Sequence, residues 1–390
     1  MGRRYLLAED TIDRRDLDDL IEWLRTSPWL TQGPLTERFE TEWCAWLGAG
    51  HASFVNSGSS ADLLMYSAAL LSGRLANRKI VVPAVSWATT VAPAIQLGFE
   101  PLMCEADPRT FGLDLGHLEE LLARHAPAAV ILVHVLGVPV DMDPLLRLKE
   151  RHRFLLMEDC CAAMGSRYDG RRVGTFGELS AFSFFFGHHL STIEGGMVCT
   201  SDEDLHDILL QVRSHGWPKN LDRAKEAAQA AKYGVLDFNR PFTFYHPGFN
   251  VRSTDLNARI GLSQMTRIDH VVERRIENHA VYQSRFRESP HFQCQSNPRA
   301  TICSISFVAL AASLEHRDRV GQALGEVGIE TRPLGGGSMG RQPFWTDRYG
   351  VQSFPVADGI HERSFMLPNH PLLSAEDVHH VCDVALGVKP

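Results

Sequence analysis

The sequence predicts an α/β fold in which a mixed or parallel β-sheet is covered by helices on both faces. Through the first two-thirds of the chain, seven short apolar runs rich in valine, isoleucine and phenylalanine alternate with helical patterns. After about residue 250 this alternation gives way to a long helical pattern. We therefore expect a large domain over residues 1–250 and a smaller C-terminal α/β domain over residues 251–390.

The strands of the large domain are expected where the apolar runs lie. Each run is short enough for one strand, and turn-forming or polar residues separate it from the next helical pattern. ADLLMYSAALLSGRLA, GHLEELLARHA and MDPLLRLKERH are the clearest helical patterns between the runs. The expected strands are residues 52–56, 79–83, 100–105, 128–135, 153–158, 179–185 and 196–200.

The C-terminal third has a different order of elements. One long helical segment begins near Ser253 and is expected to link the two domains. A strand candidate, TICSISFVAL, and a helix candidate, HRDRVGQALGEVG, precede the glycine-rich turn TRPLGGGSMG. Residues 219–247 are polar at first and then aromatic, which is typical of an insertion or of a loop that crosses between subunits. The sequence contains no internal repeat and no low-complexity segment.

Composition excludes several classes of protein. The 390 residues are 44% hydrophobic and 22% charged, as in an ordinary globular chain with a substantial core. The formal net charge of −8 gives no reason to expect nucleic acid or an anionic membrane as a partner. The first residues lack the apolar core of a signal peptide, and no apolar run approaches the roughly 18 residues that span a bilayer. A cytoplasmic location is the default expectation.

The cysteines indicate neither a metal site nor disulfides. The eight cysteines show no paired C-x-x-C spacing and lie mostly in apolar contexts, so buried reduced thiols are expected. An iron–sulfur cluster needs a closely spaced group of thiolates, and no cysteine lies between Cys199 and Cys294. We expect no metal cofactor.

Two segments have the features of a phosphate-containing ligand site. Ser57, Gly58 and Ser59 follow the first strand and open a helix, where backbone N–H groups and hydroxyls can bind a phosphate. A plain helix cap is an equally good interpretation of that segment alone. Asp159 ends the fifth strand, at the sheet edge where ligands of open α/β sheets bind, although an aspartate there is more often a turn former.

Other candidates are weaker when each is taken alone. Trp87 lies just past the second strand, where it could stack on a ligand ring or simply join the core. Asn250 and Arg252 precede the long helical segment and could reach a ligand across a subunit boundary, or only mark a helix start. Arg332 and Arg341 flank the glycine-rich turn and could meet a diphosphate or a carboxylate, but such arginines are commonly solvated.

The segment SFFFGHHLSTIEGG, residues 183–196, joins these candidates into one pattern. It resembles the cofactor segment of the DegT/DnrJ/EryC1/StrS sugar aminotransferases, in which a lysine six positions before the Glu-Gly-Gly bonds to pyridoxal phosphate (PLP). His188 occupies that position here, and an imidazole cannot form that bond. Similar segments run through most of the chain, and the histidine is similar to that of the GDP-4-keto-6-deoxy-D-mannose 3-dehydratases. These segments are SPWLTQGPLTERFE, VVPAVSWATT, LMEDCCAAMGS, RSHGWPKNL and HPGFNVR.

The resemblance implies an aspartate-aminotransferase-like fold, that of the fold type I PLP enzymes, with a seven-stranded mixed sheet. It implies that Ser57, Gly58, Ser59, Trp87, Asp159, Ser183 and Asn250 hold PLP or pyridoxamine phosphate (PMP) without a covalent bond, and that Asp159 pairs with the pyridine nitrogen. It further implies a homodimer with shared active sites. None of the six lysines lies in the segments that carry these seven residues; the lysines are Lys79, Lys149, Lys219, Lys225, Lys232 and Lys389.

The implied reaction removes the C3 hydroxyl of a nucleotide-linked 4-keto-6-deoxy sugar, with L-glutamate as amino donor and release of ammonia. His188 is its acid and base, since an ordinary histidine pKa lies near neutrality. His215 and Arg332 are candidate substrate contacts, and His189 is expected to be structural. Lipopolysaccharide or natural-product biosynthesis is the implied setting.

One position departs from the family pattern. Ala162 stands where the family usually has a glutamine, or a glutamate in the dehydratases, near the cofactor ring. This departure leaves the substrate open, including a substrate that is not a sugar. Two alternatives therefore stay beside dehydration: an aminotransferase that uses non-covalent PMP, and a PLP-binding protein without catalytic activity.

Overall fold

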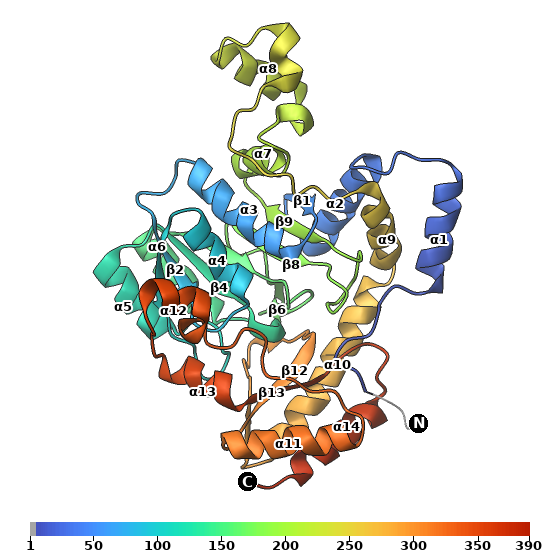
Figure 1. The fold of residues 1–390 in the computed structure, drawn as a ribbon, viewed down its shortest axis with the longest axis vertical. Helices are drawn as coiled ribbons and strands as arrows, with labels where there is room; N and C mark the ends of the chain where they lie inside the picture. The colour runs from blue at the N-terminus through green and yellow to red at the C-terminus, as the bar shows by residue number, and fades with distance from the viewer. Residues whose placement is uncertain (1–4) are drawn as a thin grey trace.

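A seven-stranded β-sheet forms the centre of the molecule in a computed structural model that describes residues 5–390 (Figure 1). Its strand order is β1-β9-β8-β5-β4-β2-β3. Each strand coincides with one of the seven apolar runs, so the expected sheet is confirmed. The strands are β1 (His51–Val55), β2 (Lys79–Pro83), β3 (Glu100–Cys104), β4 (Ala129–Val133), β5 (Leu155–Asp159), β8 (Leu179–Ser183) and β9 (Gly196–Thr200).

Strand direction brings the ends of distant segments to one edge of this sheet. β3, β2, β4, β5 and β8 are parallel to one another, whereas β9 is antiparallel both to β8 and to β1. β1 therefore runs in the same direction as the parallel strands. The carboxyl ends of β1, β2, β5 and β8 and the amino end of β9 share one edge, where ligands of open α/β sheets bind.

Alternate residues of the strands pack against helices on opposite faces of the sheet. Ile80 and Val82 face the same cluster as α3, whereas Val81 faces the cluster of α5 and α6. The strands are continuous apolar runs in the sequence because both faces of the sheet are buried. The covering helices are α3 (Gly58–Leu71), α4 (Ala88–Gln96) and α7 (Glu203–Val212) on one face, and α5 (Leu115–His125), α6 (Met142–His152), α2 (Pro34–Leu47) and α9 (Asp255–Met265) on the other.

The expected single long helix after Ser253 is wrong, because two helices occupy that segment. α9 ends at Met265, the hydroxyl of its C-cap residue Thr266 donates to the Ser263 carbonyl (2.6 Å), and α10 (Ile268–Arg287) begins two residues after this cap. Arg267 lies between them with a non-helical φ of −129°. Its guanidinium is bonded to Asp16 and to the Thr11 carbonyl, so the N-terminal helix α1 (Arg14–Arg25) fixes the break.

α10 leads to a smaller antiparallel sheet with strand order β10-β12-β13. The strand candidate near residue 305 and the helix that follows it are both present. The elements of this part are β10 (Phe292–Cys294), β12 (Ser306–Ala311), β13 (Ser364–Pro368), α11 (Leu314–Glu326), α12 (Pro343–Tyr349), α13 (Pro355–Arg363) and α14 (Ala375–Gly387). A third small sheet and short 3-10 helices complete the fold: β6 (Arg167–Tyr168), β7 (Arg171–Arg172), β11 (Ala300–Thr301), η1 (Val135–Gly137) and η4 (Met339–Arg341).

Residues 217–247 project from the body as the segment labelled α8 in Figure 1. The segment contains η2 (Pro218–Asn220), α8 (Arg223–Lys232) and η3 (Asp237–Phe242). Its aromatic residues are largely exposed, with Phe238 at 93% and Phe242 at 73%. In an isolated chain, exposing these aromatic side chains to water gives no stabilisation. Their exposure therefore fits the expectation of an insertion or of a subunit-crossing loop.

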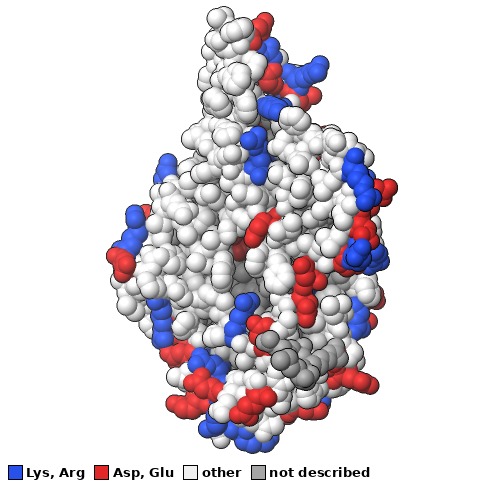
Figure 2. All heavy atoms as spheres, turned by 45° about the vertical axis from the view of Figure 1, so that its right-hand side comes forward, with Lys and Arg blue, Asp and Glu red and all other residues white. Residues whose placement is uncertain are grey.

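One face of the molecule is drawn in Figure 2 with its charged residues coloured. Basic and acidic residues alternate over the face drawn in Figure 2, without a large patch of one sign. Within residues 5–390, no helix has both the length and the apolar character needed to cross a bilayer.

We expect mildly acidic pH to destabilise the fold through buried neutral histidines. Burial lowers the pKa of His279 to about 3, and its Nδ1 contacts the Ser304 hydroxyl (2.8 Å). Because the unfolded chain binds this proton near its ordinary pKa of about 6.5, the stabilisation is complete above that pH and is lost as the pH falls toward 3. At pH 5 the loss is about 2 kcal/mol for one such histidine.

The midpoint of urea unfolding at pH 5, 6 and 7 measures this effect. His279→Gln should flatten the pH dependence by about one proton. Equal pH dependence in the wild type and this variant would contradict the assignment.

Candidate active site

The candidate residues from three separate segments meet at the shared sheet edge. Ser57 follows β1, Asp159 ends β5 and Ser183 ends β8. Gly58 packs so closely against the other two segments that an added Cβ would lie 2.6 Å from the Ser183 Cβ and 3.0 Å from the Cys161 Sγ. The structure therefore brings Ser57 and Gly58 together with two segments that lie more than 100 positions further along the chain.

The first turn of α3 has donors free for an anion. The Ser57 hydroxyl caps the helix by accepting from the Ser60 N–H (3.1 Å), while the N–H groups of Gly58 and Ser59 have no acceptor among residues 5–390. The Ser59 hydroxyl contacts Thr89 at the start of α4 (2.9 Å). Free N–H groups at a helix N-terminus suit a phosphate, so the cap and the phosphate interpretations are compatible here.

Asp159 is 5% exposed and is held by hydrogen bonds to both carboxylate oxygens. The Thr90 hydroxyl donates to Oδ2 (2.6 Å), and the Cys161 N–H donates to Oδ1 (2.9 Å). Both carboxylate oxygens of Asp159 therefore have a hydrogen-bond donor. An ionised carboxylate at this edge can pair with a protonated ring nitrogen.

Trp87 is the residue before α4 and is 61% exposed, so it does not belong to the core. The glycine-rich turn lies against its ring, since a Cβ added to Gly335 would be 3.2 Å from the indole. Thr90, which binds Asp159, is three residues further along. An exposed ring next to the candidate site is available for stacking on a ligand.

His188 lies in a loop between β8 and β9 that several hydrogen bonds hold in place. The Phe184 N–H donates to the Gly195 carbonyl, and the Thr192 N–H donates to the Phe184 carbonyl (2.9 Å each). Arg275 of α10 donates to the carbonyl of His188 itself (3.0 Å). Asn257 and Gln264 of α9 bond to the carbonyls of Thr192 and Ser191. The loop backbone is thereby fixed to the helices that link the two sheets.

The imidazole of His188 is poised as a neutral base. The residue is partly exposed, but its Nδ1 is buried and has no hydrogen-bond partner among the described residues. Burial, and to a lesser extent the charges of Arg275 and Arg332, lower its pKa to about 4, although the Ser183 carbonyl acts in the opposite direction. His188 therefore carries no proton on its second nitrogen at neutral pH and can accept one.

His189 has a different environment from its neighbour. It is fully buried, and its Nε2 contacts the Cys303 carbonyl (3.1 Å). Burial lowers its pKa well below the ordinary value. This contact favours the structural role expected from the sequence.

Asn250, Arg252 and His215 lie together at the base of the projecting segment. Ser214 pairs with Asn250 and Val55 pairs with Arg252 as isolated antiparallel bridges, so this strip borders the end of β1. Arg252 also donates to the Asn250 side chain (3.2 Å). Asn250 and His215 are exposed. Their position next to the Ser57 loop keeps a ligand role open for both.

The two arginines of the glycine-rich turn differ in how they are engaged. Arg332 is exposed, and its charge is near enough to His188 to lower the pKa of that residue. Arg341 forms ion pairs with Asp358 (2.9 Å) and Glu362 (2.7 Å). Arg332 is thus the better placed of the two to meet an anionic substrate group.

Three of the six lysines lie away from the candidate site. Lys79 begins β2, at the opposite edge of the sheet from the candidate site. Lys149 pairs with Glu178 (2.5 Å), and Lys225 pairs with Glu203 and Asp207 (2.6 and 2.7 Å). These lysines cannot replace His188 in bonding to an aldehyde at this edge.

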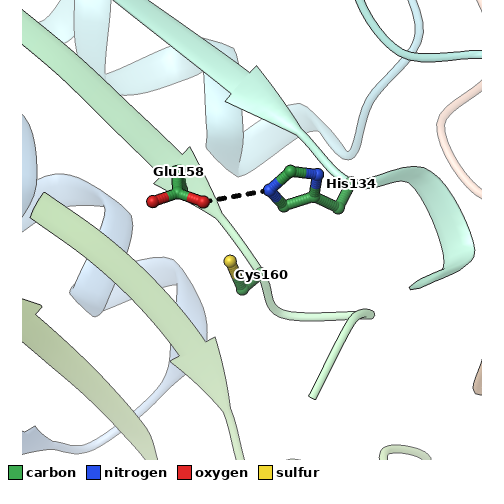
Figure 3. Close-up of side chains that lie close together, drawn as sticks. All are labelled: His134, Glu158 and Cys160. Carbon is green, nitrogen blue, oxygen red and sulfur yellow. Dashed lines mark hydrogen bonds and ion pairs between the residues drawn. The ribbon is translucent and has the colours of Figure 1, made fainter. Parts of the chain in front are cut away.

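A second cluster of ionisable side chains, His134, Glu158 and Cys160, lies within the core (Figure 3). His134 contacts Glu158 (3.1 Å), and Glu158 also accepts from the N–H groups of Gly174 (2.8 Å) and Gly177 (2.6 Å). Burial alone would raise the pKa of Glu158, but these hydrogen bonds lower it. Because the carboxylate is already satisfied, we interpret the cluster as structural rather than as a metal site.

A phosphorylated pyridine cofactor fits the residues at the sheet edge. Free N–H groups at α3 suit the phosphate, the buried Asp159 suits the ring nitrogen, and the unpartnered Nδ1 of His188 is a proton acceptor. The close packing at Gly58 leaves no room for a larger residue between these groups. These residues therefore match the phosphate and the ring nitrogen of such a cofactor.

Comparison with known proteins identifies the family. The model of the DegT/DnrJ/EryC1/StrS aminotransferase family matches residues 10–385. The chain belongs to this family. It is 31% identical over 334 residues to the GDP-4-keto-6-deoxy-D-mannose 3-dehydratase of Yersinia pseudotuberculosis, a match that covers 85% of this chain and 84% of the relative.

Solved structures of GDP-4-keto-6-deoxymannose 3-dehydratases have the same fold as this chain. The Escherichia coli enzyme with bound hydrated PLP has a TM-score of 0.89 and 26% identity, with 100% of both chains covered. A GDP-4-keto-6-deoxymannose 3-dehydratase with a trapped PLP-glutamate geminal diamine has a TM-score of 0.88 and 27% identity, covering 99% of this chain and 100% of that chain. The expected PLP-enzyme fold is confirmed.

Sequence reasoning missed three residues of the site. Thr90 and Arg275 act through contacts with residues more than 60 positions away, and no local pattern marks them. Asp62 is the one buried residue of α3 with an acidic or basic side chain of the Asp, Glu, Lys or Arg type. A carboxyl at a position of α3 that faces the core is the one feature of the sequence that could have identified Asp62. Ala162, which departs from the family pattern, packs against the core and offers no polar group.

Gly58→Ala is expected to lower both stability and cofactor affinity. The new methyl group would displace Ser183 or the start of α3, at a cost of about 1–3 kcal/mol. Thermal unfolding and PLP titration measure the two effects. Gly325→Ala in α11 is the control, because its added Cβ has nothing within 4 Å and should be neutral or stabilise by up to about 1 kcal/mol. Equal effects of the two substitutions would contradict the packing argument.

Proposed function

We propose that this protein is a PLP/PMP-dependent 3-dehydratase that removes the C3 hydroxyl of a nucleotide-linked 4-keto-6-deoxy sugar. The single observation that carries the proposal is His188, a neutral base with a free nitrogen, in the position where the family's aminotransferases have lysine. Like lysine, His188 can transfer a proton at this position, but it cannot bond covalently to the cofactor.

The cofactor is PLP or PMP, held without a covalent bond. Ser57, Gly58 and Ser59 hold the phosphate, and Asp159 holds the ring nitrogen. Trp87, Ser183 and Asn250 are the further proposed contacts. When bound, PMP supplies an amine that condenses with a ketone and a ring that accepts electrons. L-Glutamate is the proposed amino donor, supported by the glutamate adduct in the solved relative.

His188 performs the proton transfers. It accepts a proton from the C4′ carbon of the cofactor and holds it close to the departing C3 hydroxyl of the sugar. Since its pKa is lowered to about 4, the unprotonated form predominates throughout the neutral range. Arg275, through the His188 carbonyl, keeps the imidazole at the loop position from which it reaches the site.

The substrate contacts are proposed from position and charge. Arg332 lies beside His188 and suits an anionic group of a nucleotide sugar or the carboxylate of glutamate. His215 and Asn250 border the Ser57 loop at the base of the projecting segment. The exposed aromatic residues of that segment support a homodimer with shared sites. The boundary between domains near residue 250 and the cytoplasmic location stay predictions.

Spectroscopy and product analysis together test the reaction. The protein is loaded with PLP, L-glutamate is added, and the spectrum should change to that of PMP. GDP-4-keto-6-deoxymannose is then supplied while ammonia is assayed. Catalytic release of ammonia supports the dehydratase. Conversion to PMP without ammonia release would contradict dehydration of this substrate.

Transamination is the second candidate, favoured by the family's own description as aminotransferases. In that case His188 would carry out the proton shift, and nitrogen would remain in the sugar product. Mass spectrometry of the product separates an amino sugar from a deoxy keto sugar. A PLP-binding protein without catalytic activity would bind PLP but show no spectral change with glutamate.

A further inference from the structure

Asp62 is a buried carboxyl with no assigned role. It lies on α3, one turn after the Ser57–Ser59 loop, and is 2% exposed. Its Oδ1 is buried and has no hydrogen-bond partner among residues 5–390. Burying an ionised carboxylate without a partner costs folding free energy. We therefore expect Asp62 either to be protonated or to have a functional role that offsets this cost.

The unpartnered carboxyl lies beside Asp159. One carboxylate oxygen of Asp62, one of Asp159 and the Cys161 Sγ all lie within 4.8 Å of one another. Two carboxylates so close together in a buried site cannot both ionise easily, because their charges repel and burial weakens the screening by solvent.

The hydrogen bonds decide which carboxyl keeps the charge. Asp159 receives donors at both oxygens, from Thr90 and from the Cys161 N–H. The Oδ1 atom of Asp62 receives none that the structure describes. Two carboxyls in one site with such different surroundings are driven to opposite protonation states.

The ionisable groups that face Asp62 supply no positive charge. They are Asp159 on β5, Tyr66 on α3 itself, and Cys160 and Cys161 after β5. Burial, and next the charge of Asp159, raise the pKa of Asp62 well above its ordinary value. The pKa values of Tyr66 and of both thiols are also raised, chiefly by burial, so these groups are neutral.

We propose that Asp62 is a positioning residue that remains a neutral acid and fixes the charge of the pair on Asp159, so that one negative charge faces the ring nitrogen of the cofactor. The proposal rests on the proposed role of Asp159. A single protonated ring nitrogen carries one positive charge, and two ionised carboxylates would overcompensate it. The neutral acid gives Asp159 a polar neighbour without a second charge.

Infrared spectroscopy of the full-length protein without PLP tests the protonation state directly. At neutral pH the wild type should show the carbonyl band of a buried protonated carboxyl, and Asp62→Asn should remove it. An unchanged spectrum in Asp62→Asn would overturn the proposal. If Asp62→Asn does not fold, Asp62→Ser serves for the same comparison.

PLP titration tests the positioning role with two variants. Asp62→Leu replaces the polar neighbour of Asp159 with an apolar group and should weaken PLP binding about tenfold or more, because the Asp159 charge is then buried beside a nonpolar side chain. Asp62→Asn keeps a neutral donor and should restore most of that affinity. The proposal is overturned if Asp62→Asn is as weak as Asp62→Leu, which would require a charge, or tighter than wild type, which would indicate relieved repulsion.

Two further measurements separate this inference from the proposed function. If Asp159→Asn leaves PLP affinity unchanged, Asp159 does not hold the ring and the inference is overturned with it. If the infrared and PLP results hold but the wild type releases no ammonia from the sugar, the inference stands and the dehydratase assignment fails.

Discussion

Replacing His188 with asparagine is expected to lower kcat for dehydration by about 100- to 10,000-fold, the usual contribution of a general acid–base group. Asparagine preserves much of the side-chain volume but cannot accept and return a proton. PLP affinity should change much less than kcat, because His188 is not proposed to hold the cofactor. Ammonia release under saturating substrate and PLP titration give the two values.

The chain offers a matched control for this substitution. His270 is exposed on α10, so His270→Asn removes a histidine without touching the site and should retain wild-type kcat. A second variant, His188→Lys, should bond covalently to PLP, as borohydride reduction and mass spectrometry would show, while dehydration falls. Retention of dehydration in His188→Asn would refute the assignment of the base.

Asp159→Ala is expected to weaken PLP binding by about 2–5 kcal/mol, the usual cost of truncating one partner of a buried charge pair. The substitution would leave the ring nitrogen without its counter-charge and the Thr90 hydroxyl without its acceptor. The ring would also accept electrons less readily, so kcat should fall even at saturating PLP. PLP titration and single-turnover measurements separate these two effects.

Asp347→Ala is the control for Asp159→Ala, because Asp347 is an exposed aspartate of α12. It should leave the thermal midpoint and the PLP affinity unchanged. If Asp159→Ala binds PLP as tightly as the wild type, the ring-nitrogen role is refuted and the carboxylate is only a structural acceptor for Thr90 and Cys161.

Local pattern was sufficient for the central sheet, whereas the candidate site residues were proposed from the family resemblance. Each strand of that sheet is an apolar run buried on both faces, so it stands out against the amphipathic helices between the runs. The break between α9 and α10 was not predictable, because it depends on Arg267 bonding to Asp16 more than 200 positions away. The spacing of apolar residues indicates which secondary structure one segment prefers. A break of this kind is caused by a contact with a different segment of the chain.

The sequence by itself determined the fold class, the family resemblance and the substitution of His188 for the Schiff-base lysine, since all three are properties of residue type and order. Only the tertiary structure decided which side chains share an environment. It placed Thr90 and Asp62 beside Asp159, and Arg275 beneath His188. Protonation depends on burial and on neighbouring charges, and these are set by contacts between segments that the order of residues does not reveal.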